Sequence, residues 1–375
     1  MAYVDRRGSA PVVADTLRDY VHIESGRVDW VDYLKGFCIL LVVMLHSVTS
    51  VEQAFGQVGW MHLLVEISQP MRMPAFFLAS GLFFMRSVDK PRASFLDSKI
   101  LHFAYFYVLW LTIQFAFKAP GMVQDGGLGV PLETYLLAFV QPFGTLWFIY
   151  ILPVFFIATR LVRHVEPEKV LAVAVILQIV PVHTGSMIID PFASFYLWFF
   201  VGYAYSGSVF RLASRAGRRP VLYFTASLLI IAMTWILANW QIPAASLPGG
   251  IADGLDQAGF AVSRLPVVSL LLGLCGIVVL VTMSVLLSNL HLGESIRWCG
   301  AHSIVIYLAF FLPMATTRVV LLKLGIISDV GTVSLLVWLA AVIGPVMLFM
   351  LVRRLGIGGF LFERPQWARM EPARH

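Results

Sequence analysis

Three ionisable residues recur along the first long apolar stretch of the chain. Asp32 and Lys35 stand near its start, and His46 follows Lys35 by eleven residues. Eleven residues make about three turns of an α-helix, or ~16 Å along its axis, so the three side chains share one face. A histidine inside an apolar helix can exchange a proton near pH 7, as a general base does. In the structural alternative, Asp32 caps the helix, Lys35 extends its ammonium to the lipid headgroups and His46 only packs against neighbouring side chains.

A second polar group occupies the next apolar stretch. His62 and Glu66 are four residues apart and can touch on a helix. Arg72 follows, and a guanidinium within an apolar helix needs a carboxylate, a phosphate or a carbonyl as its partner. Arg72 is therefore expected either to pair with Glu66 or to stabilise charge on a substrate.

Three further residues are candidates for substrate contact. Ser80 precedes a glycine, Trp147 begins an apolar stretch, and His302 stands near the start of another. Each has a structural alternative, namely close helix packing for Ser80, interfacial anchoring for Trp147 and helix capping for His302. Three isolated cysteines make no metal cluster, and the motifs of ATP-driven pumps, zinc proteases and serine hydrolases are missing from the sequence. No metal is expected.

The composition indicates which elements position these residues. Of the 375 residues, 59% are hydrophobic and 13% are charged, and the mean hydropathy is +0.83. Soluble domains carry roughly 25% charged residues, so a water-soluble enzyme is excluded, and so is a disordered chain. The apolar stretches are continuous rather than alternating, which favours spanning helices over a transmembrane barrel. The predicted fold class is all-α, a polytopic membrane bundle.

Ten apolar stretches are predicted to span the membrane, the fifth of them short. They are 31–50, 61–84, 95–117, 143–162, 170–182, 191–210, 220–240, 265–287, 301–322 and 330–352. A further stretch, 132–141, is predicted to be an interfacial helix that leads into the fourth span.

The distribution of basic residues predicts the topology. Lys and Arg collect in the linkers after spans two, four and six and in the C-terminal tail, whereas the linkers between them hold few. Because such residues are enriched on the cytoplasmic side, both termini are expected there. The chain then divides into a cytoplasmic segment 1–29 without a signal-peptide core, a transmembrane part 30–352 and a cytoplasmic tail 353–375. The net charge of +6 reflects this topology, and no nucleic-acid partner is expected.

Four segments resemble motifs of the acyltransferase-3 family, whose members are multispan membrane enzymes that modify bacterial cell-surface carbohydrates. The first, 30–47, contains a basic residue, a ten-residue gap and a histidine. The others are 73–81, 145–150 and 300–308. Each motif is weak alone, but the four occur in the family's order and cover most of the membrane portion.

The resemblance implies an activity and its substrates. A cytoplasmic acyl-CoA, usually acetyl-CoA, would donate an acyl group to a hydroxyl of a carbohydrate or lipid-linked glycan outside the bacterial inner membrane. His46 would be the general base, Lys35 would attract the phosphates of CoA, and Arg72 would stabilise the developing oxyanion. The residues assigned to substrate contact are Asp32, Glu66, Ser80, Trp147 and His302. Whether the protein forms a homo-oligomer is left open.

Three positions depart from the family's pattern. Lys35 stands where the family usually has Arg, as in one branch of it. Arg72 stands where a His often precedes the Met-Pro of the second motif, and Phe310 stands where a His often follows the fourth. His46 therefore keeps the catalytic role without a second histidine at those places.

Two other classes of protein compete with the enzyme. A transporter or flippase for a lipid or sugar would use the same buried polar residues as a substrate path, and it should show discontinuous helices in paired positions. A membrane scaffold or sensor has no need of costly buried His and Arg. Consumption of acyl-CoA distinguishes the enzyme from both.

Overall fold

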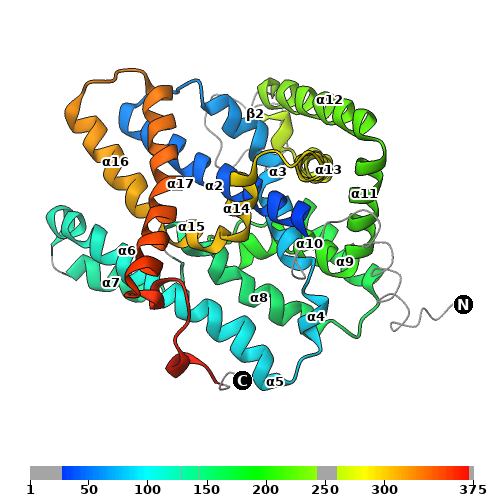
Figure 1. Ribbon diagram of the computed structural model, residues 1–375, viewed down its shortest axis with the longest axis horizontal. Helices are drawn as coiled ribbons and strands as arrows, with labels where there is room; N and C mark the ends of the chain where they lie inside the picture. The colour runs from blue at the N-terminus through cyan, green and yellow to red at the C-terminus, as the bar shows by residue number, and fades with distance from the viewer. Residues whose placement is uncertain (1–27, 128, 143, 243–259, 371–375) are drawn as a thin grey trace, which may run out of the picture.

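The computed structural model describes residues 28–127, 129–142, 144–242 and 260–370, traced in Figure 1. The helices are α2 (Asp29–Phe55), α3 (His62–Gly81), α4 (Met85–Val88), α5 (Arg92–Phe95), α6 (His102–Gly126), α7 (Gly129–Leu137), α8 (Trp147–Leu161), α9 (Pro167–Ile179), α10 (Ile189–Ala204), α11 (Ser206–Arg218), α12 (Pro220–Asn239), α13 (Pro266–Leu290), α14 (Glu294–Ala301), α15 (Ser303–Ala309), α16 (Phe311–Leu324) and α17 (Val330–Leu355). A π-helical turn, Leu96–Leu101, joins α5 to α6, and the two-residue strands β1 (Gln241–Ile242) and β2 (Phe260–Ala261) pair antiparallel.

The predicted all-α class is confirmed, and every predicted span falls on a helix. Within the described residues, six helical stretches are long and apolar enough to cross a membrane, or seven if the bent pair of α15 and α16 counts as one. The other predicted spans fall on α3, which carries several polar residues, and on α9 and α10. The last two have 13 and 16 residues, fewer than the ~20 that a span usually needs. The ten-span count stays a prediction.

Two of the predicted spans need correction. The sixth, 191–210, extends too far, because α10 ends at Ala204 and α11 begins at Ser206. The basic side chains of α11 are exposed while its small apolar ones are buried, so α11 is an amphipathic helix between two spans. The ninth, 301–322, is broken near Phe310, where α15 and α16 meet at an angle of 48°. The predicted interfacial helix corresponds to α7, which begins and ends earlier than expected.

Helix α2 forms the middle of the bundle, in contact with α3, α13, α14, α15 and α17 (Figure 1). Its approach to α14 is especially close. A Cβ on Gly300 would lie 1.6 Å from the carbonyl oxygen of Asp32, and one on Gly36 would lie 2.1 Å from that of Ile296. The first and fourth motifs therefore carry glycines because their two helices pack backbone against backbone.

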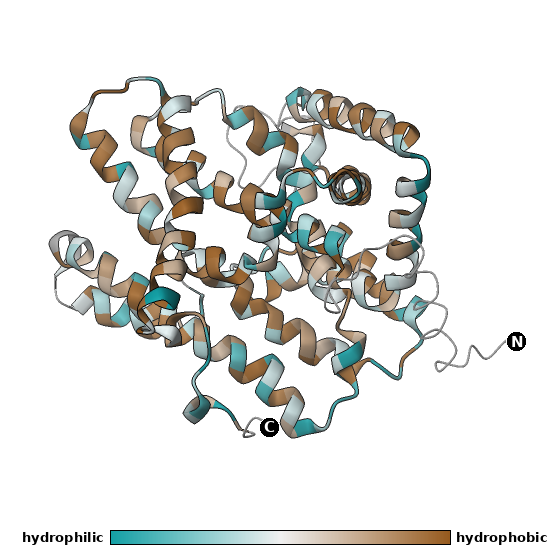
Figure 2. Ribbon diagram, viewed as in Figure 1, coloured by the Kyte–Doolittle hydropathy of each residue, from teal (hydrophilic) through white to brown (hydrophobic). Residues whose placement is uncertain are grey.

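Helices α12 and α17 consist largely of hydrophobic residues, as the colouring of Figure 2 shows, and many of these residues are exposed. Leu229 on α12 is 72% exposed and Met347 on α17 is 64% exposed. Continuous apolar surface of this kind is unfavourable in water and suits contact with lipid chains. The exposed faces and the buried core around α2 together support a membrane bundle.

Reporter fusions test the topology that the basic linkers predict. Fusions after Asp89 and Ala216 should report the cytoplasmic side, and fusions after Gly121 and Ser328 the opposite side, because the basic linkers stay inside. Each position is fused to two reporters, one active only in the cytoplasm and one active only outside it. The ratio of the two activities then gives the side of the membrane. A clear reversal at any one of the four positions would contradict the ten-span arrangement.

Candidate active site

Three of the predicted site residues line one cavity of about 200 Å³. They are His46 from α2, Arg72 from α3 and Trp147 from α8, which the sequence separates widely. We call this space the His46 cavity. Its other lining residues are Val42, Leu45, Met73, Phe76, Thr145, Phe148 and Tyr307.

The His46 imidazole is held by packing. Its ring lies 5.6 Å from the ring of Phe310, centroid to centroid, with the two planes tilted by 31°. Within the part of the chain that the structure describes, no hydrogen bond to either ring nitrogen is formed, and His46 is half-buried at the cavity wall. The ring of Phe310 thus packs against His46.

Arg72 lies in the same wall and is only 8% exposed. Its Nη1 donates to the carbonyl of Val65 at 3.1 Å and to Ser68 Oγ at 3.4 Å. Its Nε is buried and has no hydrogen-bond partner among the described residues. The pairing with Glu66 that the sequence allowed is not formed, because the Glu66 carboxylate lies 3.6 Å from His62 Nε2 instead. Arg72 therefore keeps a buried N–H group for a ligand.

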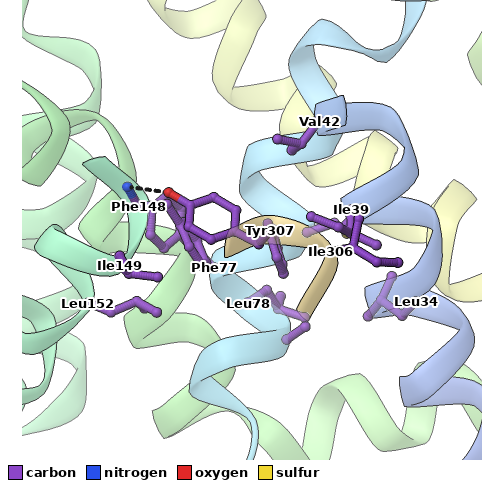
Figure 3. Packing of buried hydrophobic residues seen from close by; sticks show 14 of the residues in the cluster. Leu34, Ile39, Val42, Phe77, Leu78, Phe148, Ile149, Leu152, Ile306 and Tyr307 are labelled. Carbon is purple, nitrogen blue, oxygen red and sulfur yellow. Dashed lines mark hydrogen bonds between the residues drawn. The ribbon is translucent and has the colours of Figure 1, made fainter. Parts of the chain in front are cut away.

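Two polar residues of this cavity, Thr145 and Tyr307, were not assigned to the site from the sequence. Tyr307 donates its hydroxyl hydrogen to the carbonyl of Thr145 and accepts a hydrogen bond from the backbone N–H of Phe148 at 3.2 Å. Figure 3 shows this ring reaching from α15 to the start of α8. Thr145 Oγ1 is buried without a partner among the described residues. Thr145 lies in the motif segment 145–150 and Tyr307 in the motif segment 300–308. Membership of these segments was the one feature of the sequence that could have indicated a place in the site.

Comparison with known proteins decides the family. Residues 28–354 match the acyltransferase-3 model, which is described as an acyltransferase domain. The chain belongs to the acyltransferase-3 family. The inner membrane protein YcfT of Escherichia coli (strain K12) is 34% identical over 93 residues, 22% of this chain and 25% of YcfT. The match thus spans about a quarter of the length of that curated relative. No solved structure matches the present chain.

The basic residue of the first acyltransferase-3 motif lies away from the His46 cavity. Lys35 Nζ is 3.8 Å from Asp32 Oδ1, near the first turn of α2. The same end of the bundle holds Arg297, which contacts Asp29 Oδ1 at 3.4 Å and Glu294 Oε2 at 2.7 Å. The hydrogen bond from Arg297 holds the pKa of the Glu294 carboxyl below its usual value. Lys35 and Asp32 thus belong to a separate charged cluster.

The other predicted contact residues also lie outside the His46 cavity of this acyltransferase-3 protein. Glu66 contacts His62, whose Nδ1 is 2.8 Å from Glu52. Ser80 Oγ donates to the Phe76 carbonyl within its own helix. His302 stacks on Trp298, with ring centroids 4.1 Å apart. Among the described residues, no group of three or more His, Cys, Asp or Glu is arranged to hold a metal ion.

Tyr307→Phe tests the link between the third and fourth acyltransferase-3 motifs. Loss of the hydroxyl leaves the buried Thr145 carbonyl and Phe148 N–H without this partner, which destabilises by about 1–3 kcal/mol per group. We expect a lower thermal unfolding midpoint in detergent and slower acyl transfer. Tyr105→Phe is the matched control, because its hydroxyl bonds an exposed carbonyl that water can reach. An unchanged midpoint for Tyr307→Phe would show that the link does not hold the cavity together.

Proposed function

We propose that the protein transfers an acyl group, in the first instance acetyl, from cytoplasmic acyl-CoA to a hydroxyl of an envelope carbohydrate or lipid-linked glycan. The supporting observation is that a His46 imidazole without a hydrogen-bond partner among the described residues faces the same small cavity as Arg72. An acyltransferase needs a base to remove the proton of the acceptor hydroxyl, and a hydrogen-bond donor to stabilise the oxyanion. His46 and Arg72 are residue types that can fill these two roles. The inner membrane of a bacterium is the proposed location.

The proposed reaction proceeds in two proton transfers. His46 removes the proton of the acceptor hydroxyl while the oxygen attacks the thioester carbonyl carbon. The tetrahedral oxyanion is stabilised by the buried Arg72 Nε–H and by Thr145 Oγ1, both of which have hydrogen-bonding capacity to spare among the described residues. The C–S bond then breaks, and the protonated His46 returns its proton to the departing thiolate. The products are the ester and free CoA.

The charged cluster at the start of α2 is proposed to receive the donor. Lys35 lies about three turns of helix from His46, or ~16 Å, so it cannot touch the same reacting atoms. Its side chain is 30% accessible, which leaves the ammonium able to approach a phosphate. Lys35 is therefore proposed to attract the phosphates of CoA while the thioester extends toward the His46 cavity.

A transporter remains the competing function, and the structure offers it little support. A carrier built from inverted repeats needs broken helices in paired positions. Such a carrier needs two broken spans in corresponding positions, whereas among the described residues one sharply bent pair of helices, α15 and α16, forms a broken span. Its break places Phe310 against His46, which suits a fixed site.

Purified protein supplied with acetyl-CoA and envelope glycans stripped of their esters tests the proposal. We expect free CoA to appear in step with a mass increase of one acetyl group on the glycan, measured by mass spectrometry. Glycans from cells that lack the gene should lose the same ester mass. Glycan uptake into vesicles without CoA release would instead identify a transporter.

A further inference from the structure

A second and larger cavity, of about 680 Å³, adjoins the His46 cavity. Arg72 and Met73 line both spaces, so this pair of residues forms their common wall. The rings of Trp147 and Phe195, one from each cavity, lie 5.8 Å apart. The two cavities are therefore neighbours that share Arg72 and Met73 of α3.

The walls of the larger cavity come from five elements. Helix α3 contributes the segment around Pro70, α10 contributes Ser194, Phe195 and Trp198, and α13 contributes Ser269. The remaining wall is formed by Ser263 and Arg264 of the 3₁₀ turn Val262–Arg264, and by the end of α9 with the segment after it, residues 177–183. This is the end of α9 opposite to its basic N-terminal linker, so the charge distribution places the cavity toward the outer face.

The chemistry of these walls suits a carbohydrate. The ring of Phe195 stands beside hydrogen-bonding groups, which include the hydroxyls of Ser194 and Ser269 and the guanidinium groups of Arg72 and Arg264. The volume lies within the usual ~300–1,000 Å³ of ligand sites. The Oε1 atom of Gln178 is buried without a partner among the described residues. Pro74 has no N–H, so the Pro70 carbonyl also lacks its helical partner. These acceptors suit hydroxyl groups, whereas a lipid chain would leave them unpaired.

We propose that the larger cavity binds the acceptor glycan, which places one hydroxyl past Arg72 and Met73 into the His46 cavity. The assignment rests on the proposed function, because it supplies the second substrate of that reaction. It also gives Arg72 two contacts, since its guanidinium borders both the bound glycan and the reacting carbonyl. Acceptor and donor then approach His46 from opposite ends of the bundle.

Cysteine labelling tests this assignment without depending on catalysis. Ser194→Cys and Ser269→Cys place a thiol in the cavity, and Ser328→Cys, at an exposed position outside it, is the matched control. Each purified variant is treated with a water-soluble maleimide, with and without envelope glycans from which the esters have been removed. The unsubstituted protein, treated in the same way, corrects for the partly exposed Cys275.

We expect the glycans to slow labelling of the two cavity cysteines and to leave Ser328→Cys unaffected. Maleimide attached at either cavity position should reduce acyl transfer by at least about tenfold against the same unlabelled variant. Equal labelling rates with and without glycan would overturn the assignment, even if acyl transfer itself is measured. Glycan protection without CoA release would support the binding site and overturn the proposed reaction. Protection by phosphatidylglycerol vesicles in place of glycan would assign the cavity to lipid.

Discussion

His46→Gln should reduce acyl transfer by ~10²–10⁴-fold, the usual effect of losing a positioned general base. Glutamine is polar and of similar reach, but its amide does not accept a proton near neutral pH. The fold should survive, because the imidazole makes no hydrogen bond within the described chain and contacts Phe310 through its ring. The measurement is release of CoA and esterification of glycan by the purified variant.

The matched control for this substitution is His164→Gln, at an exposed position on the basic linker before α9. It should transfer acyl groups at the rate of the unsubstituted protein. His46→Ala should resemble His46→Gln in activity, since both remove the same base. Transfer by His46→Gln within about threefold of the original rate would show that His46 only packs, and that another group removes the proton.

Arg72→Lys should reduce kcat by ~10²–10³-fold, as expected when a donor to a developing oxyanion is removed. The guanidinium uses Nη1 for the Val65 carbonyl and Ser68 while its Nε stays buried beside the cavity. A lysine ammonium is a single point charge and cannot keep both arrangements. Single-turnover rates with saturating acetyl-CoA and glycan give the size of the effect.

Arg354→Lys, at an exposed position near the end of α17, makes the same exchange outside both cavities and should be neutral. A protein that combines Arg72→Lys with Thr145→Ser should have the same kcat as Arg72→Lys alone, because serine preserves the Oγ atom of Thr145. Near-normal turnover in Arg72→Lys would remove the catalytic assignment and leave Arg72 as a structural cap on the Val65 carbonyl.

The sequence was sufficient to predict the helices, and it singled out His46 and Arg72 as candidates for the site. Continuous apolar stretches predict helical spans because a backbone in lipid must form its hydrogen bonds within its own segment. His46 and Arg72 were conspicuous as ionisable groups within these stretches. Their meeting at one cavity depends on the contact between α2 and α3, which helical periodicity does not specify. Lys35 shares the helix face of His46 but stands ~16 Å away along it, so its predicted part in attracting the phosphates of CoA stays a prediction.

Other features depend on contacts between distant segments. Tyr307 and Thr145 are ordinary residues in apolar helices until α15 packs against the start of α8, and that contact joins positions 162 residues apart. The bend at Phe310 and the turn after Ala204 interrupt apolar patterns that are continuous in the sequence. The larger cavity likewise needs five separate elements in place, so its polar residues could not be grouped beforehand.

The short helices beside the larger cavity have a consequence for the surrounding bilayer. With 13 and 16 residues, α9 and α10 are only ~20 and ~24 Å long, against a hydrocarbon thickness of ~30 Å. Where these helices span the bilayer as predicted, the lipid next to them must thin, or headgroups and water must follow the helix ends inward, at a modest free-energy cost per ångström of mismatch. The membrane is then thinnest beside the cavities to which the proposed substrates come. Local thinning of this kind shortens the path that each has to cross.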